Sequence, residues 1–453
     1  MTLVLILSSV LMALIITVEG INFRRTRRIT FLTAVHVLIV IGYCLPPFLV
    51  AFLPDTPWQY GPNGPAYNPW GDRLYILDLA EHLRLSPGIY VSVGLILFGA
   101  YGTLAFTYLV SSRLLPALPD VDAISSPALV GSGAALGTLA VAAIGLYATQ
   151  FSSFPDMMVS GTYIREGTLQ AQRGYLQILG QVGVPAFFLL VASGIQYPGI
   201  RRVLLLLFAA IVWGFVVLRM LHAGGRLELG AFILAPLIGW VFTLKSPKLV
   251  AFTSIPVAAL ILIIASLPHE YFRHPIMLLP DVMRSLTVAL PSYLLTFLAQ
   301  FSFPHIAAAH TMTVVPELIE LRHFIDVPLG LLYMLPNFSG VETLPPMILS
   351  LHVRLLPWIP VDLFSFGYYS LGTIGVLISF AAFGFLLALF DNWLTASVGW
   401  LGQTLRTAWL FYLPFRLFYA DPYATLQSGF GLIMGTMIIL GLTLAADFRT
   451  RTR

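Results

Sequence analysis

Apolar residues form long runs along this chain, and short polar stretches separate them. Windows of about 17–25 mostly apolar residues predict eleven membrane-spanning helices. These lie near residues 2–19, 30–53, 88–111, 127–150, 174–196, 203–221, 227–244, 249–267, 364–390, 397–418 and 425–446. Each run is long enough to cross the hydrocarbon core of a bilayer, which is roughly 30 Å thick. The pattern therefore predicts an all-α integral membrane protein.

Composition narrows the class further. The chain is 58% hydrophobic and 10% charged, with a mean hydropathy of +0.88, and these values exclude a soluble globular protein. Its single cysteine, Cys44, excludes an internal disulfide framework and a cysteine metal cage. The Gly/Ala-rich run 131–143 lies inside a predicted span, so it indicates close helix packing and not a nucleotide-binding loop.

The placement of basic residues predicts the orientation. Four arginines follow the first apolar run at once: Arg24, Arg25, Arg27 and Arg28. We therefore expect a retained first span, with the N-terminus outside and the C-terminal tail in the cytoplasm. Both lysines, Lys245 and Lys248, then fall inside, whereas the outer side carries arginine alone. The planar guanidinium of arginine can form two parallel hydrogen bonds to a phosphate, so this bias indicates a phosphorylated ligand on the outer side. A GC-rich genome would also favour arginine over lysine.

The apolar runs divide the chain into three parts. Residues 1–267 hold eight spans with outer loops at 54–87 and 151–173, and residues 364–453 hold the last three spans and the tail. Between them, residues 268–363 form a large outer segment whose apolar stretches are interrupted by prolines. Such a pattern predicts partly re-entrant or interface-lying helices around a cavity. Most of the chain's histidines also lie in this segment, together with many carboxylates and arginines.

A polar stretch at residues 219–228 separates two of the predicted spans. If one helix continued through it, Arg219, His222 and Arg226 would share a face. The Gly224-Gly225 pair instead favours the end of one helix and the start of the next. In both cases basic side chains meet at one membrane edge, which suits an anion. The simpler alternative is an arginine that extends to the interface from a short turn.

Other motifs carry little chemistry. His269, Glu270 and His274 have the spacing H-E-x-x-x-H, which differs from the zinc motif H-E-x-x-H, and prolines flank them. No phosphate-binding P-loop occurs. The spans hold few ionisable residues, whereas an ion-coupled transporter usually needs more. We expect no metal, no cofactor and no nucleic-acid partner.

Three short motifs resemble one enzyme family. These are Phe23-Arg24-Arg25-Thr26-Arg27 after the first span, Gly224-Gly225-Arg226 at a span start, and the glycine-rich stretch 367–376 followed by Phe383-Gly384. With the long late outer segment, they resemble bacterial O-antigen (oligosaccharide repeat-unit) polymerases of the Wzy type, closest in pattern to enterobacterial common antigen polymerases. The likeness covers most of the chain as topology. At residues 335–346 the chain lacks the basic residue of the family's Pro-Gly-Lys/Arg-Pro segment.

The resemblance implies a GT-C-like membrane glycosyltransferase of the bacterial inner membrane, with the N-terminus in the periplasm. Its substrates would be undecaprenyl-pyrophosphate-linked oligosaccharides. A hydroxyl of one lipid-linked repeat unit would attack the anomeric carbon of a growing lipid-linked glycan, and polyprenyl pyrophosphate would leave. The reaction would be metal-independent and occur at the bilayer surface. A chain-length regulator protein is a further expected partner.

The same resemblance gives expected roles to residues. Arg226 would be the main residue that binds the departing pyrophosphate. Five further residues would assist it: Arg219, His222, Gly225, Arg322 and Arg416. His305 or His310 would act as the base for the incoming hydroxyl, with Glu317 and Asp326 as alternatives. A packed, hydrogen-bonded histidine remains the simpler interpretation of either position.

Two other functions fit the same pattern of spans. An O-antigen ligase shares the late outer segment but transfers the glycan to a lipid A core. A flippase or other carrier of lipid-linked oligosaccharides would instead need polar residues along the interior of the helix bundle, which this chain lacks.

Overall fold

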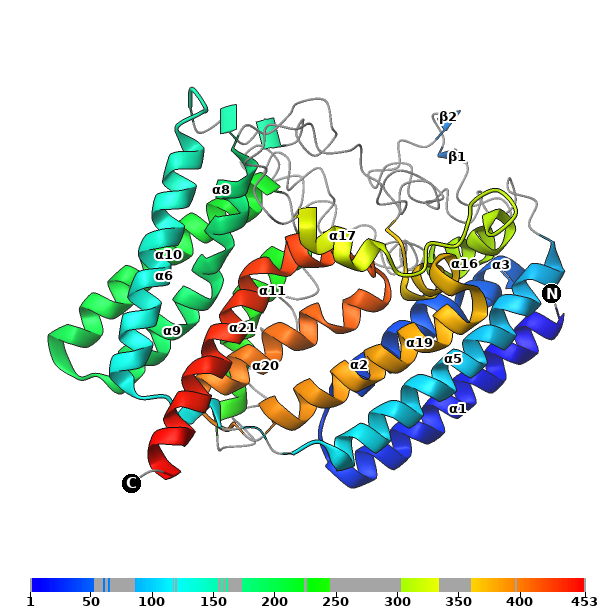
Figure 1. The fold of residues 1–453 in the computed structure, drawn as a ribbon, viewed down its shortest axis with the longest axis horizontal. Helices are drawn as coiled ribbons and strands as arrows, with labels where there is room; N and C mark the ends of the chain where they lie inside the picture. The colour runs from blue at the N-terminus through cyan, green and yellow to red at the C-terminus, as the bar shows by residue number, and fades with distance from the viewer. Residues whose placement is uncertain are drawn as a thin grey trace. The chain divides into compact units, whose positions relative to one another are not determined.

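The computed structural model describes residues 2–52, 60–61, 64–65, 86–116, 118, 120–153, 156–157, 160–161, 173–223, 226–244, 303–333, 360–395 and 397–451 (Figure 1). These residues belong to two compact units. The first unit comprises Met1–Leu115, Met283–Asp391 and Leu413–Thr425. The second comprises Pro116–Val282, Asn392–Tyr412 and Leu426–Arg453. Each unit therefore combines stretches that are far apart in the sequence.

The described helices confirm an all-α membrane protein. Eight of them are long and apolar enough to cross a bilayer: Thr2–Thr26, Phe31–Phe48, Pro87–Leu114, Ser126–Ala148, Gly174–Gln196, Gly199–Ala223, Leu363–Leu394 and Pro422–Ala446. Glu228–Thr243 is apolar but shorter. The predicted span 249–267 lies outside the described residues. Among these, β structure is limited to β1 (Tyr60–Gly61) and β2 (Gly64–Pro65), which pair antiparallel.

In the first unit, α1 (Thr2–Thr26) packs beside α5 (Pro87–Leu114), as Figure 1 shows. Along α1 the buried apolar residues are spaced at helical intervals and form one narrow stripe, which includes Val4, Leu11 and Ile15. Most of the remaining surface of α1 is also apolar and exposed, for example at Leu3, Ile6 and Ile16. A helix that is apolar on every side, but packed on only one, suits contact with lipid.

Buried polar contacts fix the next helices of this unit. Thr30 begins α2 (Phe31–Ile39) with a capping box to Thr33, and η1 (Val40–Cys44) and α3 (Pro46–Phe52) follow. The Phe31 amide donates to Asp391 Oδ2 over 3.0 Å, and the Tyr108 hydroxyl donates to the same oxygen over 2.6 Å. One carboxylate thus joins α2, α5 and the end of α19 (Leu363–Leu394).

The sequence predicts a single continuous helix over 364–390, but α19 contains a sharp break. Leu371 and Gly372 have non-helical backbone angles, and Gly372 has φ +60° and ψ −147°. A Cβ added at Gly367 would lie 2.6 Å from the Cα of Val376, so the short first part of α19 folds back on the second. The carbonyls of Tyr369 and Ser370 accept the backbone amides of Arg322 and His323. The second part of α19 alone is long enough to span a bilayer.

In the second unit, glycines allow three helices to pack closely. α6 (Ser126–Ala148) contacts α9 (Gly183–Gln196) and α10 (Gly199–Ala223). A Cβ at Gly133 would lie 3.1 Å from Leu190 Cγ, and one at Gly137 would lie 3.0 Å from Val212 Cγ2. This confirms that the glycine-rich run 131–143 serves helix packing.

The predicted span 397–418 is wrong. α20 extends only from Trp400 to Tyr412, and a 13-residue helix is roughly 20 Å long, which is less than the bilayer core. The reason is local, because Pro414 lacks an amide hydrogen and begins the 3₁₀ turn η5 (Pro414–Leu417). Gln403, Thr404 and Thr407 are also buried in α20, which packs against α11 (Arg226–Thr243).

Candidate functional site

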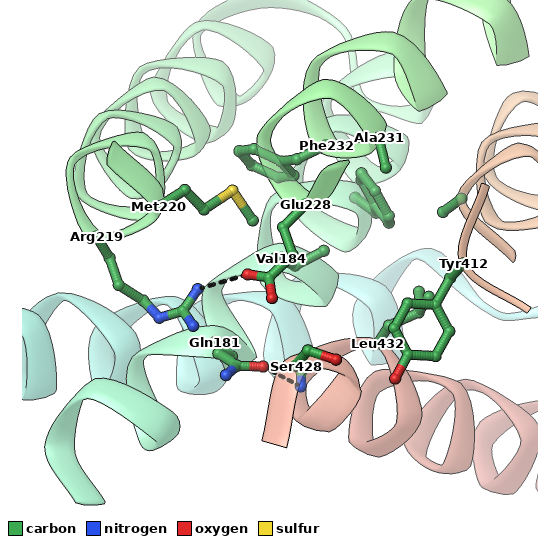
Figure 2. A pocket seen from close by; sticks show the side chains of 13 residues that line it. Gln181, Val184, Arg219, Met220, Glu228, Ala231, Phe232, Tyr412, Ser428 and Leu432 are labelled. Atoms are coloured by element: carbon green, nitrogen blue, oxygen red, sulfur yellow. Dashed lines mark hydrogen bonds and ion pairs between the residues drawn. The ribbon is translucent and has the colours of Figure 1, made fainter. Parts of the chain in front are cut away.

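A small, partly open cleft lies within the second unit; about 460 Å³ around it is free of protein atoms, and part of that space is open to solvent. Its walls come from the start of α9 and the preceding 3₁₀ turn η4 (Gly180–Val182), and from α10, α11, α20 and α21 (Pro422–Arg451). Most of the lining is apolar, including Phe188, Met220 and Phe232. Figure 2 shows that Arg219 and Glu228 point toward one another in this cleft. The polar stretch 219–228 therefore contributes directly to a cavity.

Arg219 is the buried cation of the cleft. It lies in the last turns of α10 and is only 5% exposed. Its Nε donates to the carbonyl of Gln177 over 2.9 Å, in the short helix α8 (Gly174–Leu179). Its Nη1 lies 3.7 Å from Glu228 Oε2, beyond hydrogen-bond distance, and makes no hydrogen bond to the described residues. The guanidinium is thus fixed at its Nε, while its buried Nη1 has an ion pair but no hydrogen bond.

Glycine makes room for this arginine. A Cβ at Gly180 would lie 2.5 Å from Ile144 Cγ1 and 3.6 Å from Arg219 Cδ. The chain there forms η4 in place of a regular α-helix turn, between α8 and α9. The apolar stem of Arg219 can therefore pass close to the backbone while its charged end reaches the cleft.

Glu228 supplies the opposite charge. It is the third residue of α11, where a carboxylate interacts favourably with the positive end of the helix dipole. Its side chain is 23% exposed, whereas that of Arg219 is 6% exposed. The carboxylate therefore contacts solvent more than its partner does.

Gln181 fixes the opposite wall. Its side-chain amide donates to the carbonyl of Gln427 over 2.7 Å and accepts the amide of Gly431 over 3.2 Å. Both partners belong to α21, so Gln181 joins η4 to that helix. These bonds connect η4 to the wall of the cleft that contains Ser428 and Gly431. Figure 2 shows Gln181 beside Ser428.

His222 has a structural environment and does not line the cleft. Its Nδ1 donates to the carbonyl of Met157 over 2.7 Å, and its Nε2 accepts the hydroxyl of Tyr147 over 2.9 Å. The residue is 2% exposed. Both ring nitrogens are therefore occupied by protein groups, so the expected contact of His222 with pyrophosphate is not supported by this arrangement.

The other expected residues of this stretch are only partly described. α11 begins at Arg226, as expected for a new helix after the glycine pair, but the side chain of Arg226 lies outside the described part. Gly225 also lies outside it. Their expected contact with pyrophosphate stays a prediction.

Two of the other expected residues meet in the first unit. Arg322 Nη2 donates to Asp326 Oδ1 over 2.8 Å, and Asp326 is fully buried at the start of α17 (Asp326–Tyr333). Arg416 lies in η5 with its guanidinium carbon 5.7 Å from the ring centre of Tyr419. Asp326 is therefore already engaged by a cation, which makes it a poor general base.

The two candidate histidines occupy α16 (Phe303–Val314) in different environments. His305 is 3% exposed and stacks on Tyr90 with ring centres 5.4 Å apart. Burial lowers the pKa of His305 to about 4. His310 is partly exposed. Its partial burial also lowers its pKa from the ordinary value. Glu317 is exposed beyond the end of α16.

Asp362 was not among the expected site residues. It precedes α19 and accepts the Tyr43 hydroxyl and the amide of Phe364 at its Oδ2. Burial raises the pKa of Asp362 to about 6. Its helix-start position was readable from the sequence, but its partner is more than 300 residues away. Among the described residues, no cluster of three or more metal-ligating side chains occurs, and the His269–His274 motif lies outside them.

These features define the class as a multi-pass, all-α membrane protein with a charged cleft in one unit. Comparison with known proteins adds no closer relation: no family model, curated protein or solved structure matches the chain.

Proposed function

We propose that the protein polymerises lipid-linked oligosaccharide repeat units at the outer face of a bacterial inner membrane. The donor would be a growing glycan on polyprenyl pyrophosphate, and the acceptor the next lipid-linked repeat. The observation that carries this proposal is the buried guanidinium of Arg219, which faces an apolar cleft and has an unused donor atom.

The chemistry needs such a cation. The acceptor hydroxyl oxygen forms a bond to the anomeric carbon, while the bond from that carbon to the pyrophosphate oxygen breaks. The leaving group takes the electron pair, and a base takes the hydroxyl proton. Negative charge grows on the pyrophosphate, and a preorganised cation in a dry site stabilises it strongly. Arg219 meets these requirements, and Arg226 remains a second candidate from the sequence.

Of the two expected bases, His310 is the better candidate. Its pKa lies below the ordinary value, so its ring is neutral at pH 7 and able to accept a proton. His305 is also neutral, but a pKa of about 4 makes it a weak base, and its ring is almost fully enclosed. We therefore assign a packing role to His305. The identity of the base stays a prediction from the sequence, because His310 and the Arg219 cleft belong to different units.

Incubation of the purified protein with one synthetic polyprenyl-pyrophosphate repeat unit tests the proposal. A ladder of products on a gel supports polymerisation. No product until a lipid A acceptor is added would indicate a ligase instead. Transbilayer movement of the substrate without any new glycosidic bond would indicate a carrier, and either outcome would reject the polymerase.

A further inference from the structure

The cation of the cleft already has an anion beside it. Glu228 Oε2 lies 3.7 Å from Arg219 Nη1, close enough for an ion pair and too far for a hydrogen bond. A hydrogen-bonded pair of these two groups would normally be about 1 Å shorter. The contact therefore neutralises the arginine without satisfying its hydrogen-bonding capacity.

The two partners differ in how firmly they are held. Arg219 is anchored by its Nε on the carbonyl of Gln177, and its side chain is 6% exposed. Glu228 stands in the first turn of α11 with a 23% exposed side chain, so it can turn toward solvent at lower cost. An incoming anion would thus find a fixed cation and a displaceable carboxylate.

The rest of the cleft suits a chain of hydrocarbon. Val184, Phe188, Met220, Phe232 and Leu432 present apolar surface around the charged pair. A small inorganic anion would leave this surface unused, because hydrophobic stabilisation grows with the apolar area buried. The ligand that uses both features is an amphiphile with a phosphate-type head and an apolar tail.

We propose that Glu228 is a built-in competitor for Arg219, and that a phosphorylated amphiphile binds by displacing it from the guanidinium. The identity of the lipid rests on the proposed function. The exchange of anions at Arg219 does not depend on it. A phosphate can offer two oxygens to the guanidinium at hydrogen-bond distance, whereas Glu228 Oε2 lies 3.7 Å from Arg219 Nη1. Glu228 would therefore lower the affinity of the cleft for weakly anionic ligands, because these lack enough charge to displace it.

Binding of farnesyl pyrophosphate to the purified full-length protein in detergent tests the exchange. We expect Glu228→Gln to bind it about fivefold more tightly than the wild type, because the competing charge is gone. Arg219→Gln should weaken binding at least about tenfold, since a charge-assisted contact is lost. Isothermal titration calorimetry measures both, with inorganic pyrophosphate and farnesol as the headgroup-only and tail-only ligands.

The control is Glu320→Gln, which removes an exposed glutamate of the first unit and should leave every affinity unchanged. If Glu228→Gln does not fold, Glu228→Asp retains the charge on a shorter side chain and should tighten binding in the same direction by a smaller factor. Equal affinity in the wild type and the Glu228 variant would overturn the competitor role. Equal affinity for inorganic pyrophosphate and farnesyl pyrophosphate would overturn the amphiphilic ligand.

The outcome is separable from the polymerase assay. A tightened Glu228→Gln variant in a protein that forms no glycan ladder would support anion exchange and reject polymerisation. A glycan ladder with unchanged affinities would support polymerisation and reject the exchange.

Discussion

Arg219 illustrates what one residue in a membrane helix requires. Its charge is buried, so it needs a fixed acceptor, a counter-charge and space for its stem. Gln177, Glu228 and Gly180 supply these from three different elements. The sequence indicated an anion site at this stretch from its basic residues. It could not indicate Gln177 and Gly180, because they lie about forty residues earlier and carry no charge.

Arg219→Lys tests whether the shape of this cation matters. Lysine keeps the charge but cannot both donate to the Gln177 carbonyl and present a planar edge to the cleft. We expect glycan polymerisation to fall by about 10²–10³-fold, as is typical when one preorganised donor is lost. Protein abundance in the membrane should be unchanged.

The matched control is Arg202→Lys, an exposed position near the other end of α10, which should retain full activity. Arg226→Lys, measured in parallel, decides between the two arginines. Wild-type chain lengths with Arg219→Lys, together with short chains for Arg226→Lys, would move the role to Arg226.

His305 should make the protein sensitive to acid. Its folded-state pKa of about 4 lies below the ordinary value near 6.5, so the unfolded chain binds the proton more readily. Above about pH 6.5 the neutral ring costs the folded protein nothing. As the pH falls from about 6.5 toward about 4, the free energy of unfolding decreases by roughly 3 kcal/mol because of this residue. Thermal unfolding of the wild type and of His305→Gln between pH 7 and pH 4 measures this.

We expect the acid-dependent loss of stability to be smaller in His305→Gln. His323→Asn is the control, because His323 is exposed and has φ +52°, a conformation that asparagine tolerates. Parallel pH profiles for the wild type and His305→Gln would contradict the buried, neutral state of this ring.

At the scale of elements, glycine decides where helices break and where they approach. The glycine-rich stretch 367–376 was recognisable in the sequence, but hydropathy alone made it part of one span. Hydropathy does not report the sign of φ, so the reversal at Gly372 was not visible. In contrast, the close packing of the run 131–143 was predictable, because small residues at helical spacing have that consequence whichever helix they meet.

Gly372→Ala should destabilise the protein by about 1–3 kcal/mol, because a Cβ is strained at φ +60° and ψ −147°. The space around the position is open, with no atom within 4 Å of an added Cβ, so the cost would be conformational only. Gly102→Ala in the middle of α5 has equally open surroundings and a helical backbone, and should be neutral or slightly stabilising. Thermal unfolding in detergent compares the two, and similar shifts for both would refute the reversal.

α20 depends on a cap from a distant loop. Asp122 in η3 (Val121–Ala123) accepts the amide of Gly399 over 2.5 Å, just before α20 begins. Asp122→Ala should cost roughly 0.5–2 kcal/mol, because a helix-start amide loses its acceptor. Asp122→Asn retains an acceptor oxygen and should cost less. Denaturant unfolding measures both, and an equal loss for the two variants would rule out capping.

At the scale of the whole molecule, composition and hydropathy were sufficient for the class and for eight spans. They were not sufficient for the two units, since each unit combines stretches separated by more than 100 residues. The failed span 397–418 shows the same limit. An apolar stretch can be a short buried helix when polar side chains such as Gln403 find partners inside the protein, here the Ser397 carbonyl at 2.6 Å.

The positions of the arginines along the sequence predict an orientation that cysteine labelling can test. The native Cys44 is fully buried, so the wild type should not react with a membrane-impermeant maleimide. Leu318→Cys, at an 80% exposed position, should react in intact cells, and Leu114→Cys, at 76%, only after the membrane is opened. The reverse pattern would invert the proposed topology and place the acceptor chemistry in the cytosol.

The contact between Gly367 and the backbone of Val376 has a practical consequence for engineering. Two main chains touch there with no side chain between them, so random mutagenesis should recover almost no functional clones altered at Gly367 or at its neighbour Gly375. Gly102, Gly131 and Gly145 have no such neighbour and should accumulate substitutions freely. A library designed to improve expression would therefore do best to hold the first pair constant and vary the other three.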